Sequence, residues 1–236
     1  YAYRPREGQF ACVIEDITER KHMEETLVFL AECGYTASGE SFFQSLARYL
    51  ADKLDMDFVC IDRLLGDGLQ AQTVAVYCNG EFLDNIVYGL RDTPCGDVVG
   101  KSICCFPRDV RKLFPNDPAL EDLRAESYAG TTLWSFDGKP VGLIAVISRK
   151  PLLNSKFVES VLQMVAVRAA GELERERAEL AMRESEELHR TILNASPDDI
   201  SITDLQGRIR MVSHKGLAMF RADQLDELLG RPLTDF

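Results

Sequence analysis

The sequence predicts an α+β fold in which an antiparallel sheet is flanked by helices and long linker helices lead out of it. Two hairpin signals predict the sheet, because Asn79-Gly80 and Asp137-Gly138 each stand between apolar runs. Amphipathic helical patterns precede and follow this strand-rich middle of the chain. A second, shorter set of strand and helix signals occupies the C-terminal segment.

The N-terminal part of the chain predicts a strand that runs into a capped helix. The run Phe10–Ile14 is short, apolar and alternating, and the string Asp16-Ile17-Thr18-Glu19-Arg20-Lys21 follows it almost directly. Asp16 is a helix-capping residue type, and Glu19 stands three residues later, where its carboxylate can accept from the backbone N–H of the cap residue. We therefore expect a helix from Ile17 to about Ala37.

The middle of the chain alternates between apolar runs and turn residues. Residues 41–54 predict an amphipathic helix, with Phe42, Leu46 and Leu50 on one face. Strands are expected at 57–62, 70–78, 85–90, 127–136 and 140–148. We expect residues 93–118 to form a loop region, because prolines interrupt its short apolar runs.

Residues 157–188 predict a long helix whose first part is apolar and whose second part is charged. Its first part, to Ala170, is apolar and should pack on the sheet, whereas residues 172–190 are densely charged. Leu173 and Leu180 continue an apolar seam along the charged part, a pattern typical of a coiled-coil arm that pairs two copies. We expect glutamate at both positions to weaken such a dimer without unfolding the sheet domain; the alternative is a single, partly ordered helix. Strands at 199–205 and 208–213 and short helices at 215–220 and 222–229 should follow.

Composition limits the classes of protein to which this chain can belong. The chain has 236 residues, of which 46% are hydrophobic, enough for one core of ordinary size with flanking pieces. Its net charge of −11 argues against binding to nucleic acid or to an anionic membrane surface. No apolar run approaches the roughly 18 residues of a membrane span. Seven scattered cysteines without a C-x-x-C pair indicate reduced thiols in a cytoplasmic protein rather than a disulfide framework or a zinc site.

Two motifs in the middle of the chain resemble the GAF family. The first is Tyr88-Gly89-Leu90-Arg91-Asp92-Thr93-Pro94-Cys95-Gly96-Asp97, an apolar strand followed by Thr-Pro-Cys and a short acidic helix. The second is Glu126–Leu133 followed by Asp137–Val146, which resembles the hairpin that closes the family's sheet. The resemblance implies a GAF domain with its linker helices at residues 22–178.

Both ends of the chain resemble pieces of PAS sensor domains. The string from Asp16 to Lys21 is similar to the motif that ends such domains, so residues 1–21 are expected to be the end of one. Residues 179–236 are expected to be a coiled-coil linker and the first half of another, on the match of Leu188–Ile200, Thr203–Ile209 and Leu225–Leu233. Ser213 stands where that family usually has Asn, and serine caps a helix about as well.

These resemblances imply a sensory and signal-transmission module of a bacterial multi-domain protein, with a sensor histidine kinase as the expected parent. A diguanylate cyclase or phosphodiesterase parent is the alternative, and so is a GAF block that senses nothing and serves as a spacer and dimerisation module. We expect no enzymatic activity in this chain, because it contains no nucleotide-binding or nucleophile motif. We expect no metal ligands, and the sequence does not identify a cofactor. The three histidines, His22, His189 and His214, all lie outside the middle block. Their positions argue against haem and against a bilin held by a Cys-His pair.

The candidate ligand site lies between the sheet and the segment from Thr93 to Phe106. That segment carries small and apolar groups, which can cover a pocket without filling it. The expected ligand-binding residues are Tyr77, Tyr88, Cys95, Val98, Phe106 and Tyr128. The expected signal-relay residues are Asp16, Thr18, Arg20, Leu173 and Leu180. Besides a small molecule, the expected partners are a second copy of the chain and an adjacent output domain.

Overall fold

The computed structural model describes residues 2–3, 11–12, 17–33, 40–66, 68–195, 200–222 and 224–235. Its contacts divide the chain into two compact units, Tyr1–Arg175 and Glu176–Phe236. Helix α6 (Ser155–Ala195) begins in the first unit and continues into the second.

The first unit is built on an antiparallel sheet with the strand order β5-β4-β3-β9-β8-β7, and β6 also pairs with β4. The strands are β3 (Phe58–Leu65), β4 (Gln70–Cys78), β5 (Glu81–Leu83), β6 (Val87–Gly89), β7 (Cys104–Phe106), β8 (Ser127–Trp134) and β9 (Pro140–Ser148). Asn79 and Gly80 join β4 to β5 with φ of 49° and 95°, the positive values that a tight hairpin turn requires. The two predicted hairpins are confirmed.

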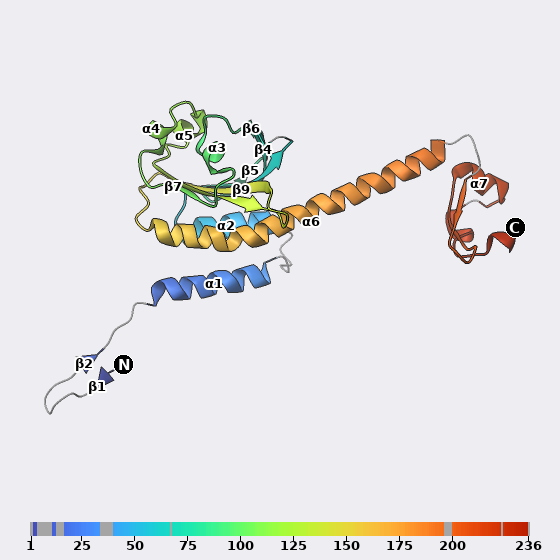
Figure 1. The fold of residues 1–236 in the computed structure, drawn as a ribbon, viewed down its shortest axis with the longest axis horizontal. Helices are drawn as coiled ribbons and strands as arrows, with labels where there is room; N and C mark the ends of the chain where they lie inside the picture. The colour runs from blue at the N-terminus through green and yellow to red at the C-terminus, as the bar shows by residue number, and fades with distance from the viewer. Residues whose placement is uncertain are drawn as a thin grey trace. The chain divides into compact units, whose positions relative to one another are not determined.

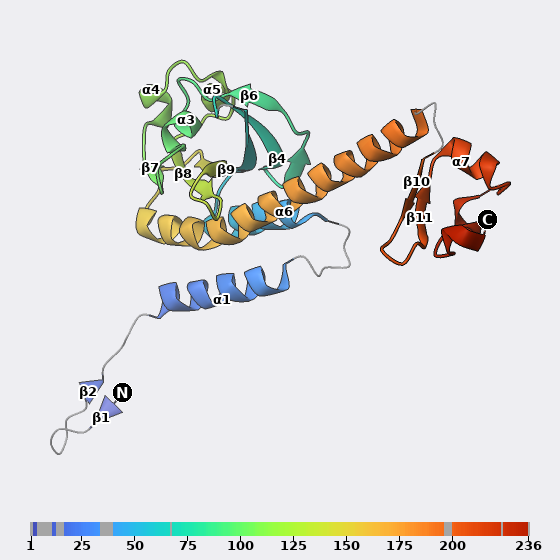
Figure 2. The same cartoon turned by 45° about the vertical axis from the view of Figure 1, so that its right-hand side comes forward.

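One face of the sheet is covered by α2 (Phe42–Leu54) and the first part of α6, with α1 (Thr18–Glu32) beneath them (Figures 1 and 2). Ser41 and Gln44 form a capping box at the start of α2, which fixes where that helix begins. Val161 and Leu162 of α6 have no exposed surface, so the predicted packing of its apolar part on the sheet is confirmed. Helix α1 contacts α2 where the Tyr49 ring stacks on Phe29, with centroids 3.9 Å apart.

The start of α1 differs from the sequence expectation. The N-cap position is Ile17, which supplies no side-chain cap, and the helix begins at Thr18. Asp16 lies outside the described residues. The remainder of the predicted strand Phe10–Ile14 also lies outside them, apart from Ala11–Cys12 (β2), which pairs with Ala2–Tyr3 (β1).

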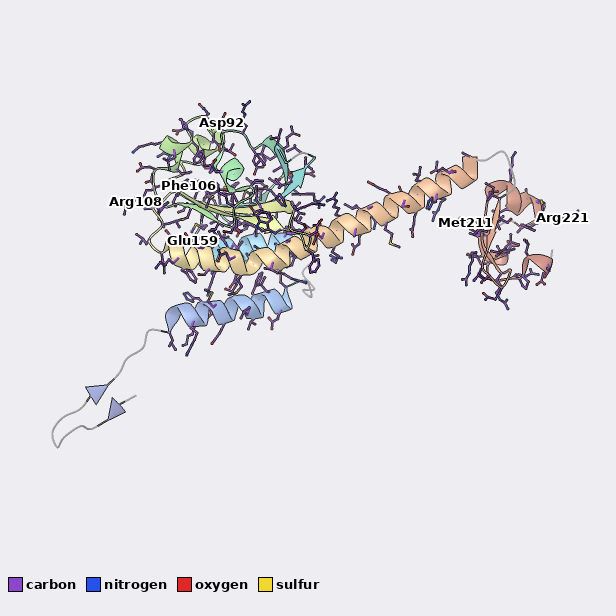
Figure 3. All side chains as sticks on the ribbon, viewed as in Figure 1. Asp92, Phe106, Arg108, Glu159, Met211 and Arg221 are labelled. Atoms are coloured by element: carbon purple, nitrogen blue, oxygen red, sulfur yellow. The ribbon has the colours of Figure 1, made fainter. Side chains whose placement is uncertain are left out.

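The opposite face, called here the distal face, carries three short helices, and the expectation of a loop over 93–118 is wrong. The helices are α3 (Pro94–Val98), α4 (Val110–Leu113) and α5 (Pro118–Asp122). Thr93 and Asp117 each cap a helix whose first residue is proline, so the same prolines that suggested a loop start two of the helices. The segment also contributes β7, which pairs with the outer edge of β8. In Figure 3, Asp92 lies on the distal side of the sheet and Glu159 lies on α6 at the helical side.

The second unit contains a small hairpin with short helices. Its elements are β10 (Ser201–Thr203), β11 (Ile209–Val212), α7 (His214–Met219), η1 (Leu225–Glu227) and η2 (Leu233–Asp235). Ser213 caps α7, because its hydroxyl accepts from the Gly216 N–H at 3.2 Å. The helix predicted at 222–229 is only the short η1, since the Gly230 N–H donates to the Ile209 carbonyl and the chain must leave the helix to reach it.

Among the described residues, no helix combines the length and the apolar character that crossing a membrane requires.

A buried polar cluster as the candidate functional site

Strand β3 places two polar side chains on the distal face. Val59 and Ile61 point into the core shared with α2 and α6, so the alternation of a strand directs Cys60 and Asp62 the other way. Asp62 sits at a β-bulge, because its partner on β4 is Thr73 whereas that of Ile61 is Ala75. Asp62 has no exposed surface, although a carboxylate is a residue type that interiors normally exclude.

Two donors reach one oxygen of this carboxylate and none reaches the other. The Tyr88 hydroxyl donates to Asp62 Oδ2 at 2.9 Å, and the Cys60 thiol donates to the same atom at 3.4 Å. Asp62 Oδ1 has no hydrogen-bond partner among the described residues. Burial raises the pKa of Asp62 to about 7, against the lowering effect of the bonds from Tyr88 and Cys60. The carboxyl group is therefore poised to change charge near neutral pH.

Tyr128 and Cys95 complete what we call the polar cluster, which consists of Cys60, Asp62, Tyr88, Cys95 and Tyr128. The Tyr128 hydroxyl donates to Cys95 Sγ at 3.3 Å, and Tyr128 has no exposed surface. Gly130, two residues along β8, leaves room for this hydroxyl: a Cβ at that position would lie 2.6 Å from it.

The ionisable neighbours of Asp62 stay neutral. A hydrogen bond with Cys95 and burial raise the pKa of the Cys60 thiol well above its ordinary value. Burial likewise raises the pKa of the Tyr128 phenol. Because a thiol must ionise to act as a nucleophile, the raised pKa disfavours Cys60 as a nucleophile.

Helix α3 covers the cluster and is anchored at both ends. At its start, the Thr93 hydroxyl donates to the Leu90 carbonyl at 2.7 Å and accepts from the Gly96 N–H at 3.1 Å. At its end, the Thr132 hydroxyl of β8 donates to the Val98 carbonyl at 2.7 Å. Cys95 and Val98 are thereby held against the sheet.

Comparison with known proteins identifies the architecture. No family model matches the sequence, and no curated protein matches it significantly. The GAF domain of a phosphoenolpyruvate-protein phosphotransferase (ptsP) from Coxiella burnetii has a TM-score of 0.58 and 12% identity, covering 70% of this chain and 99% of that one. The corresponding GAF domain from Acinetobacter has a TM-score of 0.52 and 15% identity, covering 70% and 98%. The chromophore-binding domain of the Stigmatella aurantiaca bacteriophytochrome has a TM-score of 0.53 and 11% identity, covering 73% and 68%.

The first unit has a GAF-like fold. Within it, five of the six residues expected to bind a ligand share the distal face: Tyr88, Cys95, Val98, Phe106 and Tyr128. Tyr77 does not join them, so the structure does not bring it to the candidate site. It belongs to the core on the helical face, where its ring packs on Phe82 with centroids 4.9 Å apart. Side chains alternate between the two faces along a strand, and on β4 Tyr77 points to the helical face whereas its neighbour Val76 points to the distal face.

Sequence reasoning missed Asp62 and Cys60, the centre of the polar cluster. The sequence did contain a signal for them. Asp62 directly follows the apolar run Phe58-Val59-Cys60-Ile61 and stands two residues after Cys60, so in a strand both side chains point to the same face. That spacing alone does not tell which face of the sheet is closed over by helices, so it does not predict that Asp62 is buried.

The expected relay residues of the long helix separate into two environments. Leu173 is buried in the core of the GAF-like unit, where it packs over Gly142 of β9. The expectation that Leu173 could become glutamate without disturbing this core is therefore wrong. Leu180, one heptad later, is 47% exposed.

The expected relay residues at the N-terminal joint are only partly described. Arg20 is exposed on α1 and pairs with Glu24 at 3.9 Å. Thr18 is the first residue of α1. A relay role for these positions, as for Leu173 and Leu180, stays a prediction.

Two grooves of the GAF-like unit lie away from the polar cluster. One, of about 290 Å³, is lined by α1 and α2 residues that include Phe29, Arg48 and Tyr49. The other, of about 280 Å³, lies beside Trp134 and is lined also by Thr131 and Val167. Neither groove is lined by Cys95 or Phe106. Among the residues that the structure describes, no group of three His, Cys, Asp or Glu side chains is arranged to hold a metal ion.

Proposed function

We propose that the GAF-like unit is a small-molecule sensor within a bacterial multi-domain signalling protein, between the end of one PAS domain and the start of another. The observation that carries this proposal is the polar cluster under α3. An unsatisfied buried carboxylate oxygen costs on the order of 1–3 kcal/mol, a cost that a purely structural core avoids. Perturbed ionisable groups of this kind concentrate at functional sites.

The fold and the second unit support the wider context. The bacteriophytochrome relative is named for a chromophore-binding domain, so this architecture accommodates ligands in at least one protein of similar fold. The hairpin, the Ser213 cap and the short helices of the second unit agree with the beginning of a PAS domain. A sensor histidine kinase is the parent that we propose, with a diguanylate cyclase or phosphodiesterase as the alternative.

We further propose that helix α6 relays the ligand state through pairing with a second copy of the chain. A stripe whose residues are exposed, apart from the half-buried Glu174, follows alternating steps of four and three residues, the spacing of a coiled-coil seam. It consists of Val167, Gly171, Glu174, Ala178, Ala181, Ser185, Leu188, Ile192 and Ala195. Val167, Leu188 and Ile192 are 79%, 59% and 57% exposed. This stripe replaces the seam that we expected through Leu173 and Leu180.

Native mass spectrometry of the gently purified chain tests the sensor proposal. We expect an added mass of a small organic molecule that is released on denaturation and is reduced in Asp62→Asn. A wild-type chain that carries no added mass and that no member of a small-molecule library stabilises against heat would contradict sensing and support the spacer alternative.

Sedimentation equilibrium tests the pairing. We expect the double substitution Leu188→Glu and Ile192→Glu to weaken self-association by placing charge in the seam, while the matched control Leu180→Glu, outside the stripe, leaves it unchanged. A wild-type chain that is monomeric at high concentration, or a control as disruptive as the double variant, would refute this seam.

A further inference from the structure

The free oxygen of Asp62 specifies what kind of atom is absent from the polar cluster. The hydroxyl of Tyr88 and the thiol of Cys60 both donate to Oδ2, and the hydroxyl of Tyr128 donates to Cys95. Each of these three donors is thus committed, and none of them reaches Oδ1. When Asp62 is ionised, a ligand that completes the cluster must bring a donor to Oδ1 rather than an acceptor.

The charge of the cluster also favours a ligand that brings a hydrogen-bond donor, and specifically a cationic one. Burial raises the pKa of Tyr88 and Tyr128, and the pKa of Cys60 is raised as well, so these three groups are neutral beside an ionised Asp62. In an interior of low dielectric, an anion would be repelled and a cation attracted far more strongly than in water. The hydroxyl oxygens of Tyr88 and Tyr128 keep lone pairs after donating their hydrogens, so they add acceptors beside Oδ1.

We propose that the polar cluster binds a small ligand through a protonated amine or amidinium group whose N–H donates to Asp62 Oδ1. This inference rests on the proposed sensor function and names its ligand class. Apolar neighbours on the distal face, among them Val98 and Leu143, suit a short carbon substituent on that nitrogen.

Entry to the cluster requires one side chain to move. Asp62 and Tyr128 have no exposed surface, whereas Tyr88, on the short strand β6, is half-buried. Tyr88 is the member of the cluster that reaches the surface, and its hydroxyl holds Asp62 directly. Displacement of this ring would open the cluster from its most exposed side, which favours the smallest cations as probes.

The test uses methylammonium chloride as the probe and tetramethylammonium chloride, which has the same charge but no N–H, as the matched control. We expect methylammonium alone to raise the melting temperature of the full chain. Because it binds the ionised carboxylate, and the pKa of Asp62 is about 7, its apparent affinity should be about tenfold higher at pH 8 than at pH 6. Carboxyl carbon NMR should show the pKa of Asp62 falling when methylammonium is added.

Two variants complete the design. Asp62→Asn should lose the response, and Asp92→Asn, which alters an exposed carboxylate on the same side of the sheet, should keep it. If Asp62→Asn does not fold, the wild-type NMR titration decides alone. The proposal is overturned by an absent or pH-independent response, by an equal response to tetramethylammonium, or by a response that survives in a folded Asp62→Asn.

These outcomes separate the ligand class from the sensor function. A non-basic molecule that co-purifies at Asp62 would overturn the amine assignment and leave the proposed sensing intact. Failure of methylammonium together with an unliganded, unstabilised chain would overturn both.

Discussion

Replacing Asp62 by asparagine should stabilise the protein, and should do so increasingly as the pH rises. Asparagine has the same shape, accepts the Tyr88 hydroxyl through its carbonyl oxygen and carries no proton that titrates. The pKa of Asp62 is about 7 in the folded chain, against an ordinary value of 3.8, because the group is buried. The folded state therefore favours the protonated carboxyl group more than the unfolded state does.

The sign and size of the effect follow from this difference. Below about pH 4 the carboxyl group is protonated in both states and costs nothing. Between about pH 4 and pH 7 the unfolded chain loses its proton first, so the free energy of unfolding falls, and above pH 7 the loss is complete. At about 1.4 kcal/mol for each unit of pKa shift, the full loss is on the order of 4 kcal/mol. About 3 kcal/mol of it should develop between pH 5 and pH 8.

Urea unfolding at pH 5 and pH 8 measures the effect. Far-UV circular dichroism reports the helices, and the emission of Trp134, which is 38% exposed on β8, reports the sheet. The wild-type free energy is subtracted from that of Asp62→Asn at each pH, so that other titrating groups cancel. The exposed Asp92→Asn is the matched control and should show no such change. A difference that stays constant between the two pH values would refute the reasoning.

Three further substitutions test the packing around the site and the helix. Leu173→Ala should lower the free energy of unfolding by about 2–5 kcal/mol, because it opens a cavity in the core, whereas Leu180→Ala should change it by less than about 0.5 kcal/mol; equal effects in urea unfolding would be inconsistent with the placement of α6. Gly130→Ala should cost about 1–3 kcal/mol, since the new methyl group would press on the Tyr128 hydroxyl, and an unchanged melting temperature would count against this close approach. Thr132→Val should cost about 1–3 kcal/mol and speed amide exchange within α3, which loses an anchor at its end; exchange as slow as in the wild type would show that the anchor is dispensable.

Much of the fold could be predicted from local signals. Asn79-Gly80 and Asp137-Gly138 indicated the two main hairpins, because the positive φ at Asn79, Gly80 and Gly138 restricts the residue types that fit there. The apolar start of α6 indicated burial on the sheet. The short helices at 94–98 and 118–122 could not be separated from loop by composition, since proline at the first position of a helix has the same composition as proline in a loop.

The candidate site could be predicted only in part, because it depends on pairing between distant strands. The Thr-Pro-Cys segment drew attention to Cys95 and Val98, and both lie over the cluster. Which face Tyr77 and Asp62 occupy depends on the register of β3 and β4 and on the bulge at Asp62, and these are set by tertiary pairing. Sequence was likewise insufficient for Leu173. Its spacing of seven residues from Leu180 fits a coiled-coil seam, but it fits equally well a helix whose last buried residue is Leu173.

The central claim is that the polar cluster around Asp62 is the ligand site of a sensor. A crystal structure of the chain as purified, at a resolution that separates ordered water from organic groups, tests it most directly. We expect density for a small organic molecule under α3, with a donor nitrogen within hydrogen-bond distance of Asp62 Oδ1. A single ordered water at that oxygen, with Tyr88 and Tyr128 closed over it, would contradict the account and leave the GAF-like unit as a spacer.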